Sequence, residues 1–152
     1  MRRQHLRSVE ECYRGRNVRV FRLDRDGVVA RLRERARVML ESEPAVVEVR
    51  LFGSLARGDA HPGSDGDLFI VLRDGAAPFL SRIPRLARYF GGVGVGCDVI
   101  AYTESERSAL ADSHSAFGRA VLDEGIPLAR REGAARKATH AEKGPASGHL
   151  TR

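Results

Sequence analysis

Apolar residues gather in short segments that have the spacing of β-strands. In these segments Val, Ile, Leu and Phe either alternate with polar residues or follow one another without a break, as in half-buried and fully buried strands. The segments cover residues 18–23, 46–52, 67–72 and 97–102. Because residues 67–72 are nearly all apolar, they are expected to form a central strand buried on both faces, whereas residues 18–23 suit a short edge strand.

Longer segments place apolar residues three or four positions apart, which predicts helices. Three such segments cover approximately residues 24–43, 78–90 and 103–124. Either Asp24 or Asp26 can cap the start of the first helix. Pro84 is expected to interrupt the second helix or to mark a restart. The third begins with a capping-box pair, Thr103 and Glu106, and continues as one helix.

This order of strands and helices predicts an α/β fold, in which helices pack against one small mixed β-sheet. The 152 residues are enough for one domain, and the ends of the chain lack the apolar periodicity of its centre. Residues 1–17 are expected to be a flexible N-terminal segment, and residues 132–152 a disordered basic tail. The domain itself is expected to span residues 18–131, with a flexible glycine-rich link at residues 91–96.

Charge is distributed unevenly along the chain, whose formal net charge is +6. The first 37 residues hold 12 arginines and 5 acidic residues, whereas residues 38–129 hold 8 arginines and 13 acidic residues. A DNA-binding module usually gathers its basic residues on one folded face. Basic ends around an acidic centre therefore disfavour sequence-specific DNA binding and fit the core of a metal-binding enzyme.

Other features of the sequence exclude further classes. No apolar run approaches the roughly 20 residues of a membrane-spanning helix, and the N-terminus lacks the apolar segment of a secretory signal. Cys12 and Cys97 lie far apart and show no C-x-x-C spacing. This cysteine usage disfavours a disulfide framework or a zinc site and indicates a reducing cytoplasm.

Candidate chemistry begins with two aspartates at the start of the central strand. Side chains two positions apart on a strand point to the same face, so Asp65 and Asp67 are expected side by side. Paired carboxylates repel one another unless a cation lies between them, and oxygen ligands of this kind suit magnesium. If the strand at 97–102 pairs beside the central strand, Asp98 can reach the same cluster. Three carboxylates on neighbouring strands can hold two metal ions.

The turn before the central strand has the residues expected of a phosphate site. Glycine at position 53 lets the backbone approach a phosphate closely, and successive N–H groups there can surround an anion. The Ser54 hydroxyl can donate to a phosphate oxygen, or it can simply cap the turn. Arg57 can add positive charge to bound nucleotide, or it can brace the loop.

These residues resemble a known family. L-F-G-S-L-A-R-G-D-A-H-P-G-S-D-G-D-L-F-I-V is similar to the G-S-x-A-R-G…S-D-x-D-L motif of the DNA polymerase beta-like nucleotidyltransferase superfamily, and C-D-V-I resembles the strand that carries the family's third carboxylate. The length resembles the minimal nucleotidyltransferase branch. The resemblance implies the polymerase beta palm-like fold. It further implies triphosphate binding by Gly53 and Ser54, and catalytic metal ligation by Asp65, Asp67 and Asp98, the last also a candidate base.

One position departs from the family pattern. Gly66 stands between the two aspartates, where the family usually has a bulky apolar residue that faces the core. A glycine weakens a strand locally and leaves space beside it, but no ligand is lost.

The resemblance implies a magnesium-dependent enzyme with two metal ions, for which Mn²⁺ could substitute. It would transfer a nucleotidyl group, AMP from ATP, to an acceptor hydroxyl and release pyrophosphate. Minimal nucleotidyltransferases often accompany HEPN-type toxins, so the resemblance also implies an alternative, an antitoxin-like binding module that pairs with a HEPN-type protein. A third class, a pseudoenzyme with a structural role, is disfavoured by the complete set of acids. The sequence does not identify the acceptor.

Overall fold

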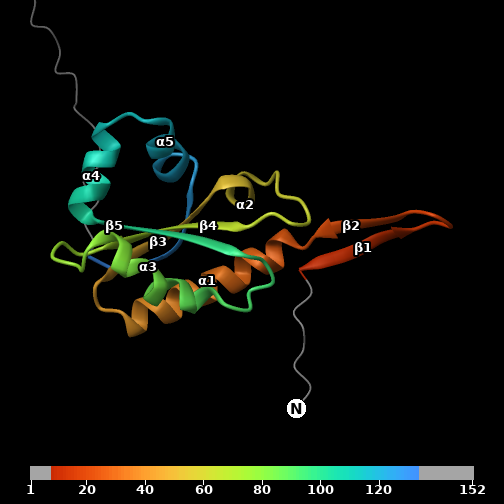
Figure 1. Ribbon diagram of the computed structural model, residues 1–152, viewed down its shortest axis with the longest axis horizontal. Coiled ribbons are helices and arrows are strands. Elements are labelled where there is room, and N and C mark those ends of the chain that lie inside the picture. The colour runs from red at the N-terminus through yellow and green to blue at the C-terminus, as the bar shows by residue number, and fades with distance from the viewer. Residues whose placement is uncertain (1–7, 134–152) are drawn as a thin grey trace, which may run out of the picture.

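A four-stranded sheet with helices on both faces forms the body of the protein (Figure 1). The computed structural model describes residues 8–133, so residues 1–7 and most of the predicted basic tail lie outside the described residues. The strand order is β5 (Cys97–Thr103), β4 (Gly66–Leu72), β3 (Val46–Phe52), β6 (Ile126–Arg130). β3 runs antiparallel to β4 and β6, whereas β5 runs parallel to β4. The predicted α/β fold with a small mixed sheet is therefore confirmed.

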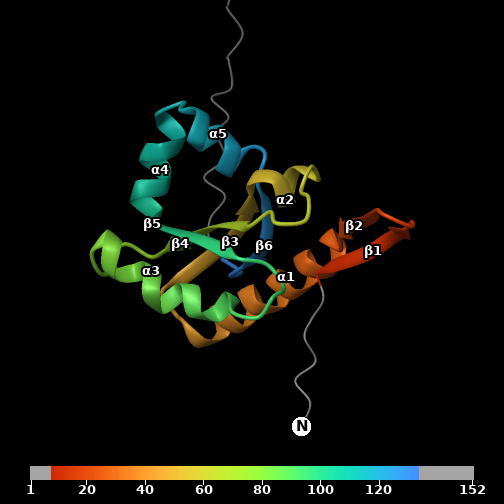
Figure 2. The ribbon, with the colours of Figure 1, turned by 45° about the vertical axis from the view of Figure 1, so that its right-hand side comes forward.

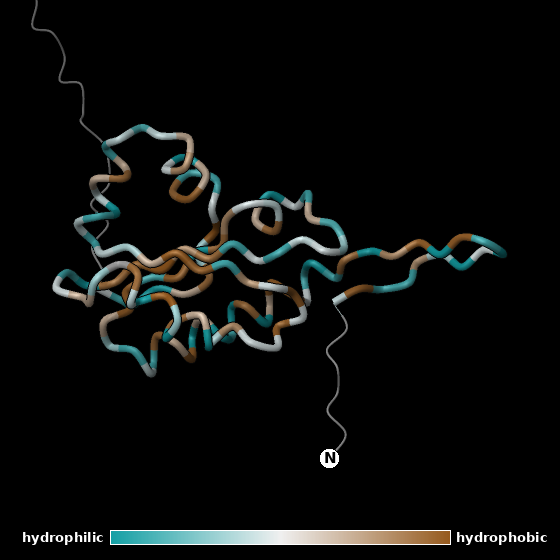
Figure 3. Tube along the Cα trace, viewed as in Figure 1, coloured by the Kyte–Doolittle hydropathy of each residue, from teal (hydrophilic) through white to brown (hydrophobic). Residues whose placement is uncertain are grey.

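Strand β4 lies inside the sheet and is covered on both faces, as its apolar sequence predicts. Leu68, Phe69 and Ile70 have no solvent exposure, and Val71 has 1%. Figure 3 shows the same concentration of apolar residues along the sheet. Since alternate side chains of a strand point to opposite faces, the two sides of β4 belong to two separate apolar clusters.

The larger cluster lies between the sheet and two helices, α1 (Arg25–Ser42) and α3 (Phe79–Ala87), which cover one face (Figure 1). Helix α1 contributes the buried side chains Val28, Val29, Leu32, Ala36 and Met39. Asp24 is its N-cap, because the Asp24 carboxylate accepts a hydrogen bond from the Gly27 amide at 3.0 Å. This settles the choice between the two predicted capping aspartates.

Helix α3 continues through Pro84, so the predicted interruption there is wrong. Proline removes one intrahelical hydrogen bond, but the neighbouring Leu86 is 4% exposed and packs into the core, which keeps the segment helical. A 3₁₀ turn, η1 (Arg88–Phe90), follows. The glycine-rich link is held rather than free, since Val93 is buried and its carbonyl accepts a hydrogen bond from Arg31 Nε at 2.8 Å.

Two short helices, α4 (Glu104–Asp112) and α5 (Ala116–Leu122), cover the opposite face of the sheet. One continuous helix was expected here, and that expectation is wrong. The Ser113 hydroxyl donates to the Leu110 carbonyl at 2.7 Å, and the Ser115 hydroxyl accepts from the Gly118 amide at 3.0 Å. Such local side-chain bonds compete with helix propagation, and His114 between them adopts a φ of 48°.

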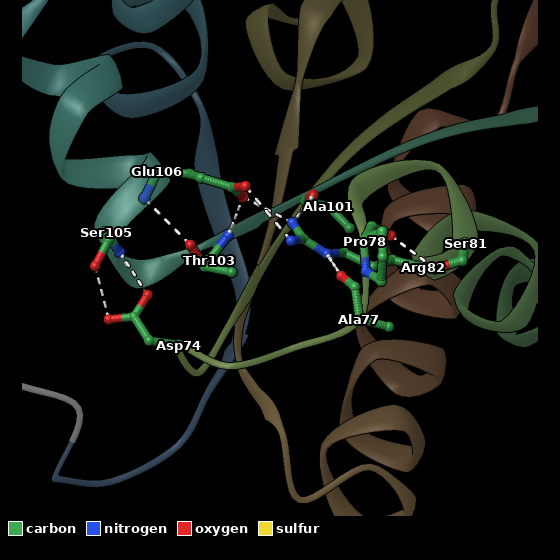
Figure 4. Close-up of polar contacts among 9 residues, drawn as sticks. All are labelled: Asp74, Ala77, Pro78, Ser81, Arg82, Ala101, Thr103, Ser105 and Glu106. Carbon is green, nitrogen blue, oxygen red and sulfur yellow. Dashed lines mark hydrogen bonds and ion pairs between the residues drawn. The ribbon is translucent and has the colours of Figure 1, made fainter.

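A polar network fastens α4 to the sheet and to α3 (Figure 4). Arg82 of α3 donates to the Ala101 carbonyl of β5 at 3.2 Å and to the Glu106 carboxylate of α4 at 2.7 Å. Glu106 also accepts from the Thr103 amide, which completes the predicted capping box. Asp74 accepts two hydrogen bonds from Ser105 in the first turn of α4. These contacts determine the direction in which α4 leaves the sheet.

An antiparallel hairpin, β1 (Val9–Arg14) and β2 (Arg19–Leu23), projects from the body (Figures 1 and 2). Residues 1–17 were expected to be a flexible segment, whereas Val9–Arg14 of this segment form strand β1. Two ion pairs join the strands of the hairpin, Glu11 with Arg19 and Glu10 with Arg22, the latter at 3.0 Å, and Glu11 also binds Arg14 within β1. In the part of the chain that the structure describes, no helix combines the length and apolar character needed to cross a bilayer.

Candidate active site

Two aspartates lie opposite one another on neighbouring strands of the sheet. Asp67 of β4 and Asp98 of β5 are partners in parallel register, so their side chains leave the same face, the one covered by α4 and α5. Asp65 precedes β4 and is two positions from Asp67. The pairing on which the Asp98 prediction depended is present, and the three predicted acids lie at one edge of the sheet.

The charges of Asp65 and Asp98 act on Asp67. Burial raises the pKa of Asp67, the charges of Asp98 and Asp65 raise it further, and the Arg57 charge acts in the opposite direction. Burial, followed by the charges of the same three carboxylates, raises the pKa of the Cys97 thiol to about 11, so this thiol stays protonated at neutral pH. Within residues 8–133 none of the three aspartates forms an ion pair.

The donor set suits a hard divalent cation, although it does not form a closed site. Carboxylate oxygens without protein partners are the ligands that magnesium prefers. Among the described residues, no three Asp, Glu, His or Cys side chains are arranged as they stand to hold a metal ion. Asp65 and Asp98 are exposed, so rotation of their side chains can bring oxygen atoms toward a cation beside Asp67. The residues therefore fit magnesium by chemistry and require a local adjustment to hold it.

Gly53 lies directly against Asp67. This glycine starts helix α2 (Gly53–Arg57) with a φ of +71°, a conformation that side chains rarely adopt. A Cβ at position 53 would lie 2.1 Å from Asp67 Oδ2. The glycine therefore permits both the turn after β3 and the close approach of the turn to the carboxylate.

The other two predicted nucleotide-binding residues follow on α2. Across residues 8–133 the Ser54 hydroxyl makes no hydrogen bond, and α2 has no side-chain cap, so the alternative that Ser54 caps the turn receives no support. Arg57 Nε donates to Asp59 at 3.3 Å, and both side chains are largely exposed. This contact fits the alternative that Arg57 braces the loop. The charge of Arg57 also acts on Asp67, where it lowers the pKa of the carboxyl group.

Arg25 positions this site, although it was not among the residues predicted from the sequence. Arg25, the first residue of α1, donates from Nε to the Leu55 carbonyl at 2.7 Å and from Nη2 to the Ala56 carbonyl at 3.2 Å. Arg25 thereby joins α1 to α2. No local signal distinguishes this residue, because it is one of 12 arginines in the first 37 residues.

Replacing Arg25 with methionine is expected to destabilise the protein by about 2 kcal/mol, since two carbonyl oxygens lose a charged donor. It is also expected to raise the KM for nucleotide, because α2 carries the Gly-Ser turn. Urea unfolding and nucleotide titration measure the two effects. Arg35→Met on the exposed side of α1 serves as the matched control. Equal stability and KM in both variants would show that Arg25 does not position α2.

The raised pKa of Asp67 predicts a pH dependence of the metal-free protein. A carboxyl whose folded-state pKa is above its unfolded value stabilises the fold while protonated, and this contribution is lost as the pH rises through the two values. In EDTA, the stability contributed by Asp67 is therefore expected to fall from the ordinary pKa of 3.8 upward. Urea unfolding of the protein and of Asp67→Asn from pH 3 to pH 7 measures it. Parallel profiles would contradict the raised pKa.

Gly66 leaves room for one carbon atom. A Cβ at position 66 would lie 3.4 Å from Cys97 Sγ and 3.6 Å from Leu32 Cδ1, which are ordinary contacts. Gly66→Ala is expected to stabilise the protein by about 0.5 to 1 kcal/mol and to leave activity unchanged. Gly96→Ala is the contrasting variant, since its Cβ would lie 2.4 Å from Asp65 Oδ1. Destabilisation by Gly66→Ala in urea unfolding would mean that position 66 tolerates no side chain.

Comparison with known proteins assigns the chain to a family. The nucleotidyltransferase domain family matches residues 31–110, more than half of the chain. A solved structure from Sulfolobus solfataricus, assigned as a nucleotidyltransferase, has 23% identity, covers 72% of this chain and 86% of its own, and superposes with a TM-score of 0.54, which shows a common fold.

Two further solved structures are similar to the chain. One, assigned as a minimal nucleotidyltransferase, is 32% identical across 65% of this chain and 94% of its own, with a TM-score of 0.46. The other, a toxin-antitoxin with AMP-PNP, is 20% identical across 72% of this chain and 76% of its own, with a TM-score of 0.44. None of the curated proteins compared with the chain matches it significantly. The domain match confirms the resemblance seen in the sequence: the chain belongs to the nucleotidyltransferase domain family.

Proposed function

We propose that the protein transfers a nucleotidyl group, AMP from ATP, to an acceptor hydroxyl in a magnesium-dependent reaction that releases pyrophosphate. The observation that carries this proposal is the parallel register of Asp67 and Asp98, with Gly53 in contact with Asp67. Carboxylates that face one another beside a glycine turn suit metal-bound triphosphate, because the acids alone would repel it.

In this proposal the chain's own residues bind and orient the triphosphate. The backbone N–H groups at Gly53 and Ser54 donate to phosphate oxygens, and the Ser54 hydroxyl donates to another. Arg57 supplies positive charge at the exposed edge of the same turn. Arg25 holds this turn in place through its hydrogen bonds to the Leu55 and Ala56 carbonyls.

Chemistry takes place at the α-phosphorus. The acceptor oxygen forms a bond to this phosphorus, the bond between the α-phosphorus and the bridging oxygen breaks, and pyrophosphate leaves with the electron pair. Asp98 accepts the proton of the acceptor hydroxyl. Asp65, Asp67 and Asp98 would hold two magnesium ions, which neutralise phosphate charge and lower the pKa of the hydroxyl when bound.

Labelled ATP tests the proposal. The protein, magnesium and a co-expressed HEPN-type partner are incubated with ATP labelled either at the α-phosphate or at the γ-phosphate. We expect the α-label on the acceptor and the γ-label in pyrophosphate, with neither product formed by Asp67→Asn. Transfer of the γ-label to the acceptor would identify a kinase and would overturn the proposal. Absence of both nucleotide binding and transfer would also overturn it.

A second function, an antitoxin-like module that binds a HEPN-type protein, is favoured by the hairpin. Its exposed apolar side chains are Tyr13 (58%), Val18 (57%), Val20 (44%) and Phe21 (45%). Three of its arginines are already paired with its own glutamates, which leaves the apolar residues available for contact. Such a surface suits a protein partner better than a nucleic-acid backbone.

Co-purification distinguishes binding from catalysis. Val20→Asp on the hairpin is expected to reduce recovery of a co-expressed HEPN-type partner, whereas Asp67→Asn is expected to retain it. Val38→Asp, at an exposed position of α1, is the matched control. Retention of the partner by Val20→Asp would remove the hairpin from the binding surface.

A further inference from the structure

Residues of α4 and α5 line a hollow of about 680 Å³. The two helices lie on the same side of the sheet as α2 (Figure 1). We call this cavity the α4–α5 hollow. Its volume is within the range of small-molecule sites. None of the residues proposed for the nucleotide site lines it. Its charged and polar lining consists of Arg107, Ser108, Asp112, His114, Arg119 and Asp123.

Arg107 in this lining has an unsatisfied donor. Its Nε is out of contact with solvent, and no group among residues 8–133 accepts a hydrogen bond from it. The buried Arg82 differs, since its guanidinium donates to Glu106 and to the Ala101 carbonyl. A buried donor without an acceptor destabilises a fold, because its hydrogen bond to water is lost and not replaced. Rotation of the Arg107 side chain toward the hollow would let a ligand accept this hydrogen bond and remove the penalty.

The remaining charges of the hollow are also free to contact a ligand. Arg119 Nη1 donates to the His114 carbonyl at 2.9 Å, which places a second guanidinium in the lining. Within the described ranges neither arginine forms an ion pair, and neither do Asp112 and Asp123. The hollow therefore offers donors for an anionic group and acceptors for hydroxyl or amino groups.

We propose that the α4–α5 hollow binds a small polar molecule with a phosphate or carboxylate group and with hydroxyl or amino groups. Arg107 and Arg119 bind the anionic group, and Asp112 and Asp123 accept from the hydroxyl or amino groups. The site does not depend on magnesium, because the three aspartates of the nucleotide site lie outside its lining. It is thus independent of the proposed nucleotidyl transfer.

Calorimetric titration in EDTA tests this site with two probes. AMP presents a phosphate together with hydroxyl and amino groups, and citrate presents carboxylates with a hydroxyl. We expect saturable binding of at least one probe, with AMP favoured if the anion is a phosphate and citrate favoured if it is a carboxylate. Arg107→Met is expected to weaken binding at least tenfold, whereas Asp67→Asn and the control Arg35→Met leave it unchanged. No saturable binding of either probe, or equal binding by Arg107→Met, would overturn the proposal.

Thermal unfolding provides a second measurement that does not need a ligand. Arg107→Met removes the unsatisfied donor and keeps an apolar side chain of similar length, so the melting temperature of the ligand-free protein is expected to rise by about 3 °C. Binding and stability should therefore change in opposite directions. A lower melting temperature for Arg107→Met would show that the arginine stabilises the fold and would overturn its role as a ligand donor.

Discussion

Replacing Asp67 with asparagine is expected to abolish both nucleotidyl transfer and the stabilisation of the protein by magnesium. The charges of Asp65 and Asp98 both act on Asp67, and Asp67 is the residue against which Gly53 packs. Loss of its charge would remove a proposed magnesium ligand, which is also the carboxylate that the Gly53 turn contacts. Because metal ions supply several kcal/mol of transition-state stabilisation, the rate should fall by about a thousandfold or more.

Two measurements check this expectation. Single-turnover transfer from α-labelled ATP gives the rate, and thermal unfolding with magnesium and ATP gives the ligand-induced rise in melting temperature. Asp59→Asn is the matched control, because Asp59 is an exposed neighbour that pairs with Arg57 outside the register of the acids. An unchanged magnesium response in Asp67→Asn would contradict the metal site, even if activity were lost.

Gly53→Ala is expected to reduce transfer by about a hundredfold, since displacement of a catalytic group by about 1 Å has an effect of that size. The added Cβ would lie 2.1 Å from Asp67 Oδ2 and 3.0 Å from its Cγ, so the carboxylate must move. The positive φ of residue 53 adds a destabilisation of about 1 to 2 kcal/mol.

Gly63→Ala separates the two effects of this substitution. Gly63 has a φ of +95°, yet a Cβ there would meet nothing within 4 Å. Both variants should therefore unfold at lower urea concentrations, but only Gly53→Ala should lose activity. If Gly63→Ala loses as much activity as Gly53→Ala, backbone strain is the cause and contact with Asp67 is not.

Local patterns in the sequence were sufficient for most of the central elements. The segments at 46–52, 67–72 and 97–102 form strands, and the capped segment after Asp24 forms a helix, because apolar periodicity and end-capping act between near neighbours in the chain. The types of residue at the candidate site were likewise evident from the spacing of the Gly-Ser turn and the acids.

Elements that depend on distant partners were missed. Strand β6 has five residues and contains Pro127, and it becomes a strand only through its pairing with β3. Strand β1 is polar throughout most of its length, and it is a strand through its antiparallel ladder with β2, across which Glu10 and Glu11 also form ion pairs. The continuity of α3 through Pro84 likewise depends on core packing beyond the helix.

Short-range spacing was enough to predict the central strands, the helix α1 and the candidate acids, because it fixes which side chains share a face. The position of Asp98 opposite Asp67, the contact of Gly53 with Asp67 and the hydrogen bonds from Arg25 to α2 arise only in the folded protein. The same holds for the buried donor of Arg107, which has no acceptor among the described residues. Each of these facts depends on strand register or helix packing between segments far apart in the chain, and the free energy that selects such contacts comes from burial and hydrogen bonding of the whole fold.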